Sequence, residues 1–196
     1  NLINNNFNPE LINEGNFNNP KHIKNNSVDC ILGMGTFYYS KNLIKTLLNQ
    51  RKKLKNKGRI IFSLRNKLFD ISTMNHYSIN FFSDLYKIYH QNKNIQKKFN
   101  SLFSGYAKRN KFIKKNIDTQ KIFTTSHNPL NIQQELLDKV NLKLNGIYFY
   151  HFHMLPPLFE SIFPEKFRKE SWKIENPNDW KGFFMASGFI VDCLKD

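Results

Sequence analysis

The stretch Ser27-Val28-Asp29-Cys30-Ile31-Leu32-Gly33-Met34-Gly35, taken with Lys55-Asn56-Lys57-Gly58-Arg59-Ile60-Ile61-Phe62-Ser63-Leu64, decides the fold class of this chain. Each stretch holds a short apolar run next to glycine, which is typical of a buried parallel strand. Between them, residues 43–54 place leucine and isoleucine at helical spacing, with Ser40 as the predicted N-cap and Gly58 as the predicted helix stop. Strand, helix and strand in this order predict a βαβ unit and an α/β fold.

Further patterns predict the remaining elements. Residues 80–116 have helical periodicity, and we expect residues 80–125 to form a helical insertion or lid. Trp172 and Trp180 are predicted to be packing residues. Other predicted segments are a short strand at 10–15, a helix at 132–140, and a helical segment at 158–172 interrupted at Pro164. Strands at about 28–32, 59–63, 146–152 and 185–193 are predicted to share one sheet, the last antiparallel to its neighbour.

Composition favours one domain over residues 1–196. The chain has 40% apolar residues, and its length suits a single core. No run approaches the roughly 20 apolar residues that span a bilayer, so no membrane span is expected. Cys30 and Cys193 lie in apolar contexts and are predicted to be buried, reduced and unpaired, which indicates a reducing compartment such as the cytoplasm.

The formal net charge is +15, which on its own points toward nucleic acid or an anionic surface. However, lysine far outnumbers arginine, and asparagine, isoleucine and phenylalanine are abundant, as expected from A/T-rich codon usage. A basic nucleic-acid-binding module, or an RNA-modifying enzyme, therefore remains the alternative function rather than the favoured one.

The order and spacing of the elements resemble the second half of a class I S-adenosylmethionine-dependent methyltransferase. Glu14-Gly15-Asn16-Phe17, followed by Ser27–Ile31, resembles that family's third and fourth strands, and Lys55–Ser63 resembles the turn into its fifth strand. Gly146–His153 and Met185–Leu194 resemble the sixth and seventh strands, which form an antiparallel hairpin in the family. The resemblance implies a mostly parallel Rossmann-like sheet with a C-terminal antiparallel strand, and S-adenosylmethionine as cofactor.

Several features of the family have no counterpart in this sequence. They are the first strand, the glycine-rich loop that follows it, and the acidic residue of the second strand that holds the ribose. We therefore expect a partial methyltransferase domain, strands three to seven, with two βα units of roughly 30 residues each preceding Asn1. The resemblance further implies that this fragment alone is inactive and binds S-adenosylmethionine weakly or not at all.

The resemblance also implies cofactor-binding residues at the carboxyl ends of two strands. Asn16 matches the position that bonds the adenine amino group, and Phe17 would lie against the adenine ring. Gly33 and Met34 match the rim that borders the methionine part of the cofactor. In the alternative interpretation, Asn16 is a turn residue and Gly33 merely ends its strand.

His151 and His153 are the candidate catalytic residues. Two positions apart on a strand, they are predicted to face the same side. They could act as a base that takes a proton from the methyl acceptor, as metal ligands, or as hydrogen-bonding residues of purely structural role. The metal interpretation lacks a carboxylate at a suitable distance, so no metal is predicted. Three further residues could line the same mouth: Tyr38, Arg65 and Asn66.

Methyl transfer from a sulfonium depends mainly on aligning donor and acceptor, so no invariant catalytic residue is required. The resemblance therefore implies a methyltransferase, which we expect to act on a small-molecule acceptor, with the helical insertion covering that acceptor.

Overall fold

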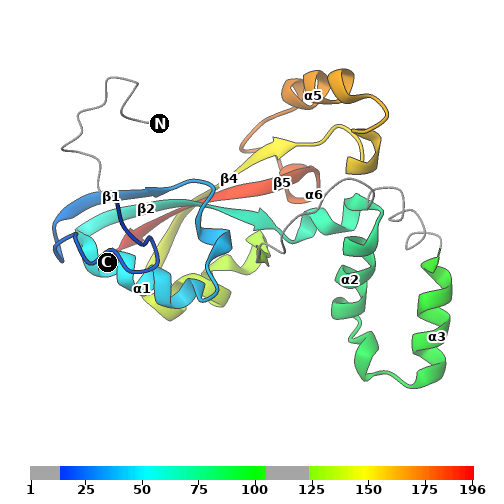
Figure 1. Ribbon diagram of the computed structural model, residues 1–196, viewed down its shortest axis with the longest axis horizontal. Coiled ribbons are helices and arrows are strands. Elements are labelled where there is room, and N and C mark those ends of the chain that lie inside the picture. The colour runs from blue at the N-terminus through cyan, green and yellow to red at the C-terminus, as the bar shows by residue number, and fades with distance from the viewer. Residues whose placement is uncertain (1–13, 105–123) are drawn as a thin grey trace.

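The computed structural model describes residues 14–104 and 124–196. One mixed sheet runs through this part of the chain, helices pack beside it, and a helical arm projects from one end (Figure 1). The strands are β1 (Val28–Gly33), β2 (Leu54–Asn66), β3 (Ser126–His127), β4 (Leu142–Phe152) and β5 (Ala186–Lys195). The α-helices are α1 (Leu43–Lys53), α2 (His76–Leu85), α3 (Lys93–Leu102), α5 (Pro164–Lys173) and α6 (Gly182–Met185). Shorter helical segments are η3 (Phe37–Tyr39), η4 (Leu68–Thr73), η5 (Ile88–His90), η7 (Pro129–Asn131), the π-helix η8 (Gln133–Leu137), η9 (Asp138–Val140) and η10 (Pro157–Phe159).

The sheet has the strand order β1-β2-β5-β4, with β3 paired to the end of β2. β1 and β3 are parallel to β2, whereas β5 is antiparallel to both β2 and β4. β1, β2 and β4 therefore point the same way, and their carboxyl ends lie at one edge. This arrangement confirms the prediction that four strands share one sheet whose last strand is antiparallel, and it confirms the predicted α/β fold class.

The hydrophobic core lies on one face of the sheet. β2 contributes Ile60, Phe62 and Leu64 to that face, and β5 contributes Phe189 and Val191 opposite them. The helical layer over these strands comes from two segments far apart in sequence, α1 and η8–η9 (Figure 1). Its fully buried members are Leu47, Leu137 and Val140.

The opposite face of the sheet is more open and corrects the prediction for Cys30. Cys30 pairs with Arg59 in the register of β1 and β2 and is exposed, because β1 is an outer strand of the sheet as described and its alternate side chains point away from the core. Leu32, on the same face, is 68% exposed. Cys193 is buried, as predicted, and both thiols are free.

The transition from α1 to β2 also differs from the sequence prediction. Asn42, rather than Ser40, caps α1 by accepting a hydrogen bond from the Lys45 amide. The helix ends at Lys53 and the chain enters β2 immediately, so Gly58 lies inside the strand. A side chain at Gly58 would meet the backbone oxygens of Lys55 and Asp29, which explains the glycine by close approach of backbone.

The predicted insertion is helical in its described part. α2, η5 and α3 form an arm that extends from the carboxyl-end edge of the sheet (Figure 1), and the rings of Phe82 and Phe103 stack at 6.0 Å to join its two helices. Residues 105–123 of the predicted lid lie outside the described residues. The same holds for residues 10–13 of the strand predicted at 10–15, and Glu14 and Gly15 are not in a strand.

Pro164 begins α5, which confirms the predicted interruption of the helical segment there. The packing prediction for the two tryptophans is wrong, because Trp172 is 79% and Trp180 is 67% exposed. On α5 the buried side chains are Phe167 and Ser171, and one residue further along a helix turns by about 100°, which carries Trp172 away from that face.

Candidate functional site

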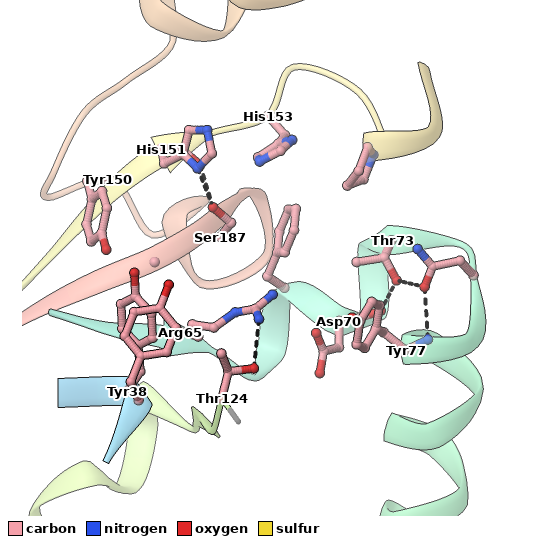
Figure 2. Close-up of a pocket in the computed structure, with 15 residues that line it drawn as sticks. Tyr38, Arg65, Asp70, Thr73, Tyr77, Thr124, Tyr150, His151, His153 and Ser187 are labelled. Carbon is pink, nitrogen blue, oxygen red and sulfur yellow. Dashed lines mark hydrogen bonds between the residues drawn. The ribbon is translucent and has the colours of Figure 1, made fainter. Parts of the chain in front are cut away.

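A cavity of about 470 Å³ lies at the carboxyl-end edge of the sheet. Small-molecule sites commonly have volumes of about 300–1,000 Å³, and in open α/β sheets they lie outside the carboxyl ends of the strands. Its lining comes from η3, the end of β2, η4 and α2, the end of β4 and the start of β5 (Figure 2). Segments that are distant in sequence therefore converge on one concave site.

The floor of the cavity is a row of residues across three strands. Arg65 of β2 pairs with Gly188 of β5, which in turn pairs with Tyr150 of β4. A Cβ atom at Gly188 would lie 2.6 Å from Cζ of Tyr150, so the glycine allows the tyrosine ring to cover β5. The Arg65 guanidinium donates to the Thr124 hydroxyl at 3.2 Å.

Two tyrosines of η3 form one wall. Tyr38 and Tyr39 have ring centroids 4.5 Å apart, and both line the cavity. Burial, followed by the neighbouring Tyr39 and Tyr150 hydroxyls, raises the pKa of Tyr38 to about 12, although Arg65 acts in the opposite direction. Tyr38 therefore stays protonated at neutral pH and can donate a hydrogen bond into the cavity.

The wall opposite the sheet comes from η4 and the start of α2. Asn75 caps α2 and accepts from both the Tyr77 amide and the Thr73 hydroxyl, each at 2.9 Å, which fixes the turn between the two helices. Asp70 lies in the preceding η4 and is partly buried. Burial raises the pKa of Asp70 to about 6, against the opposing effect of Arg65 and Lys67. Its ionised carboxylate is thus poorly solvated.

His151 sits at an irregular point of β4. Its φ of 59° is in the left-handed region, which is uncommon for residues other than glycine. The backbone N–H of His151 donates to the Glu175 carboxylate at 2.9 Å. The ring nitrogen Nδ1 lies 2.7 Å from the Ser187 hydroxyl, a contact that orients the exposed imidazole (Figure 2).

His153 differs sharply from His151. It is only 9% exposed, packs against the rings of Phe69 and Phe167 at 4.7 and 5.5 Å, and lies 4.9 Å from the His151 ring. Neither ring nitrogen has a hydrogen-bond partner in the described part of the chain. Burial, with a smaller contribution from His151, lowers the pKa of His153 to about 4. The two rings share one side, as predicted, but His153 is neutral and buried.

The three additional residues predicted for the mouth divide into two groups. Tyr38 and Arg65 line the cavity, whereas Asn66 does not. The Asn66 side chain is buried, donates to three backbone oxygens between Gly182 and Ala186, and accepts from the Leu68 amide. Asn66 thus has a structural role, because it fastens the end of β2 to the turn before β5.

The residues predicted to contact adenine lie in a second, more open depression. Glu14, Gly15, Asn16 and Phe17 line it, and its volume is about 680 Å³. The Asn16 side chain accepts from the Asn18 amide at 2.9 Å, which is the turn role of the alternative interpretation. An amide oxygen has two lone pairs, so this turn leaves one acceptor position open. The depression therefore exposes one polar acceptor, at Asn16, beside the Phe17 ring.

Gly33 is linked to this depression through an aromatic neighbour, Phe37. The Phe37 ring is 6.1 Å from the Phe17 ring, edge to face, and it also occupies the position that a side chain at Gly33 would fill. Gly33 therefore has a packing role, its predicted contact with the cofactor stays a prediction, and Met34 is 43% exposed. η3 joins the two regions, because Phe37 faces the predicted cofactor residues and the next two tyrosines line the cavity with the histidines.

No protein-family model matches this chain, and no curated protein matches it in sequence. Its fold is similar to solved S-adenosylmethionine-dependent methyltransferases from Mesorhizobium loti (TM-score 0.46, 9% identity), Thermotoga maritima (0.47, 14%) and Archaeoglobus fulgidus (0.44, 13%). The matches cover 92%, 93% and 89% of this chain. The chain spans 67%, 62% and 62% of the length of those proteins.

The cavity also contains residues that the sequence did not point to. Asp70, Thr73 and Tyr77 reach it only because η4 and α2 fold back along the carboxyl-end edge. Gly188 and Ser187 reach it from the start of β5. The one local signal was Asn75, a helix-capping residue type followed by an amphipathic segment, which marks a helix start but not a site.

Residues 14–104 and 124–196 contain neither a metal-ligand cluster nor a membrane-crossing helix. There, no group of three or more His, Cys, Asp or Glu side chains is placed to hold a metal ion. None of the helices in those ranges has both the length and the hydrophobicity of a membrane-crossing segment.

Proposed function

We propose that this chain is part of an S-adenosylmethionine-dependent methyltransferase acting on a small molecule bound in the 470 Å³ cavity. The observation that carries the proposal is the position of η3 between two regions. On one side, Phe37 contacts Phe17 and Gly33. On the other, Tyr38 and Tyr39 line the cavity. A methyl donor and its acceptor must lie next to each other, and this short helix brings their two candidate sites together.

The chain's own residues can hold the adenosine part of the cofactor. The exposed Asn16 amide offers an acceptor, and Phe17 presents an aromatic face to the open depression. When bound, S-adenosylmethionine supplies an electrophilic methyl group on its sulfonium. The protein then has to orient the acceptor, exclude water and remove a proton where the acceptor carries one.

The two histidines suit different tasks. A general base works best when its pKa lies near the working pH, and the pKa of about 4 makes His153 a poor base. His153 is better suited to donate or accept a hydrogen bond while neutral. His151 is exposed to the cavity and oriented by Ser187, so it is our candidate for the proton acceptor.

The test is a titration of S-adenosylmethionine into the isotope-labelled chain, followed by NMR because the expected binding is weak. We expect amide signals of Asn16, Phe17, Gly33 and Met34 to shift. Phe17→Leu keeps an apolar side chain against Phe37 but removes the ring face, and stacking of a base on an aromatic ring contributes about 1–3 kcal/mol. The variant should therefore bind about tenfold more weakly.

Phe163→Leu is the matched control, because Phe163 is 52% exposed and belongs to neither depression. L-Methionine, which lacks the adenosine, should leave the signals of Asn16 and Phe17 unchanged. Equal affinity of Phe17→Leu and the parent chain for S-adenosylmethionine, or shifts confined to other parts of the chain, would contradict the proposal.

A further inference from the structure

The cavity carries a cation and an anion that form no direct ion pair in the described part of the protein, although Arg65 lies near enough to Asp70 to lower the pKa of its carboxyl. Arg65 forms no ion pair in residues 14–104 and 124–196, and the Asp70 carboxylate accepts no hydrogen bond there. Both line the same cavity (Figure 2). Charged side chains in proteins are usually either fully solvated or paired. Arg65 is exposed to solvent and Asp70 is partly buried. Two charges of opposite sign that are held apart in one concave site match a ligand that carries both charges.

Arg65 is positioned for an anionic group. Arg65 lies in the floor row beside Gly188 of β5. Its contact with Thr124 occupies only one of the donors of the guanidinium. The remaining donors keep the planar fork that matches a carboxylate or phosphate.

Asp70 is positioned for a cationic group. Its carboxylate is partly desolvated, which is why its pKa is raised to about 6, and a bound ammonium would relieve that cost. The rings of Phe69 and Tyr77 line the same cavity. Aromatic faces attract cations, so the rings and the carboxylate favour the same kind of ligand group.

His153 provides the evidence that this is a formed site rather than a group of surface side chains. It is nine-tenths buried, lines the cavity, and has no partner for either ring nitrogen in the described residues. A neutral imidazole offers one donor and one acceptor, and buried polar atoms without partners are rare in native structures. Both nitrogens are shielded from solvent as well, so His153 forms a buried part of the cavity wall.

We propose that the cavity selects a small zwitterion, with its anionic group at Arg65, its ammonium group at Asp70 and its apolar part among the aromatic rings. This inference rests on the proposed function, because it names the class of molecule that receives the methyl group. The methionine part of S-adenosylmethionine carries the same pair of charges, so the experiment must separate these two sources.

Three probes share a phenol ring and differ only in their charged groups. L-Tyrosine has both an ammonium and a carboxylate, tyramine lacks the carboxylate, and 3-(4-hydroxyphenyl)propionate lacks the ammonium. Their affinities for the chain are measured by NMR titration in the absence of S-adenosylmethionine. We expect L-tyrosine to bind about tenfold more tightly than either single-charge probe, a difference typical of one charge-assisted contact.

Variants assign each charge to its residue. In Arg65→Gln, L-tyrosine and tyramine should bind equally, because the carboxylate has lost its partner. In Asp70→Asn, L-tyrosine and 3-(4-hydroxyphenyl)propionate should bind equally. The matched controls, Arg168→Gln and Asp29→Asn, change the same charges at exposed ion pairs outside the cavity and should preserve the full discrimination.

A final titration adds S-adenosylhomocysteine to the complex with L-tyrosine. Simultaneous binding supports an acceptor site, whereas competition assigns the charges to the cofactor and overturns the inference. Equal affinity of all three probes, absence of binding at millimolar concentration, or unchanged discrimination in Arg65→Gln and Asp70→Asn would also overturn it. These outcomes are independent of the Phe17→Leu titration. The probe titrations can therefore overturn the zwitterion site without contradicting the proposed function, and the Phe17→Leu titration can contradict the proposed function without overturning the zwitterion site.

Discussion

Two arginines on β2, Arg59 and Arg65, differ in whether an acidic side chain pairs with them. Both point to the same face of β2, six residues apart. Arg59 forms an ion pair with the buried Asp192, which also accepts from Asn145 at 2.6 Å. Arg65 has only the Thr124 hydroxyl as a partner among the described residues. The strand thus carries one arginine that the protein neutralises and one that it leaves available.

The difference separates structural polar groups from candidate functional ones. Near the amino end of β2, even the buried Lys195 ammonium is satisfied, by the Leu54 carbonyl and Asn26. At the carboxyl end, Asp70 forms no direct ion pair and the His153 ring nitrogens have no hydrogen-bond partner in the described chain. Buried polar groups without partners lower the stability of the fold, and proteins tend to retain such groups at functional sites. Changes at the partnered groups and at the unpartnered ones should therefore have opposite effects on stability.

The largest effect is expected for Asn66→Ala, at the residue that follows Arg65. The change leaves three backbone oxygens and the Leu68 amide without their partner in a buried region. We expect a loss of about 3–5 kcal/mol in the free energy of unfolding, measured by urea denaturation. Asn178→Ala, at an exposed position, is the control and should change stability by less than about 0.5 kcal/mol. A similarly small loss in Asn66→Ala would remove the distinction between Asn66 and Arg65.

A smaller loss is expected for Asp192→Asn. Burial alone would raise the pKa of Asp192, but hydrogen bonds from Arg59 and Asn145 outweigh it and hold the pKa below its usual value. The stabilisation is therefore present above pH of about 4 and is lost as pH falls through the lowered pKa. We expect a loss of about 2 kcal/mol at pH 7, discounted because Arg59 is half exposed, and convergence with the parent chain in acid. A loss that persists unchanged at low pH would point to packing instead of charge.

The smallest effect, and the only gain, is expected for Asp70→Asn. The folded-state pKa of about 6 exceeds the unfolded value, so the ionised form destabilises the fold as pH rises from about 4 through 6. Removing the charge should raise the free energy of unfolding by about 1 kcal/mol at pH 7, a figure discounted for solvent screening. Below pH of about 4 it should leave the free energy of unfolding unchanged. Urea denaturation at both pH values measures it. Asp29→Asn, at an ion pair exposed to solvent, should show no comparable gain. A loss of stability in Asp70→Asn would mean that Asp70 has a structural partner.

The strands were predictable because their apolar runs are short and bounded by glycine or polar residues, as at Val28–Gly33. The exposure of Cys30 was not, because the same run gives no information on whether the strand is covered on both faces. Capping by Asn42 instead of Ser40 also depends on tertiary contacts, since the Ser40 hydroxyl bonds to Asn18 and Thr46 inside the fold. Local pattern thus identified the elements better than their environments.

Apart from Tyr38, the candidate site was predictable only where residues end a strand. His151, His153 and Arg65 follow apolar runs, and their placement at the cavity follows from the geometry of parallel strands. Asp70 stands among apolar residues in a segment with no strand signal, and its role as a cavity residue depends on how η4 folds back. The sequence also gave no reason to distinguish His151 from His153. The two differ in burial, which is a property of the tertiary structure.

The left-handed backbone conformation at His151 reverses the alternation of inward-facing and outward-facing side chains along β4. Before it, even-numbered residues such as Tyr148 and Tyr150 face away from the core and Phe149 faces inward. After it, Phe152 faces inward and the odd-numbered His153 reaches the cavity. A regular strand would have sent both histidines to the side of Phe149. One backbone dihedral angle therefore lets a single strand supply a tyrosine and two histidines to the same opening, and it makes β4 intolerant of any change that restores regular alternation.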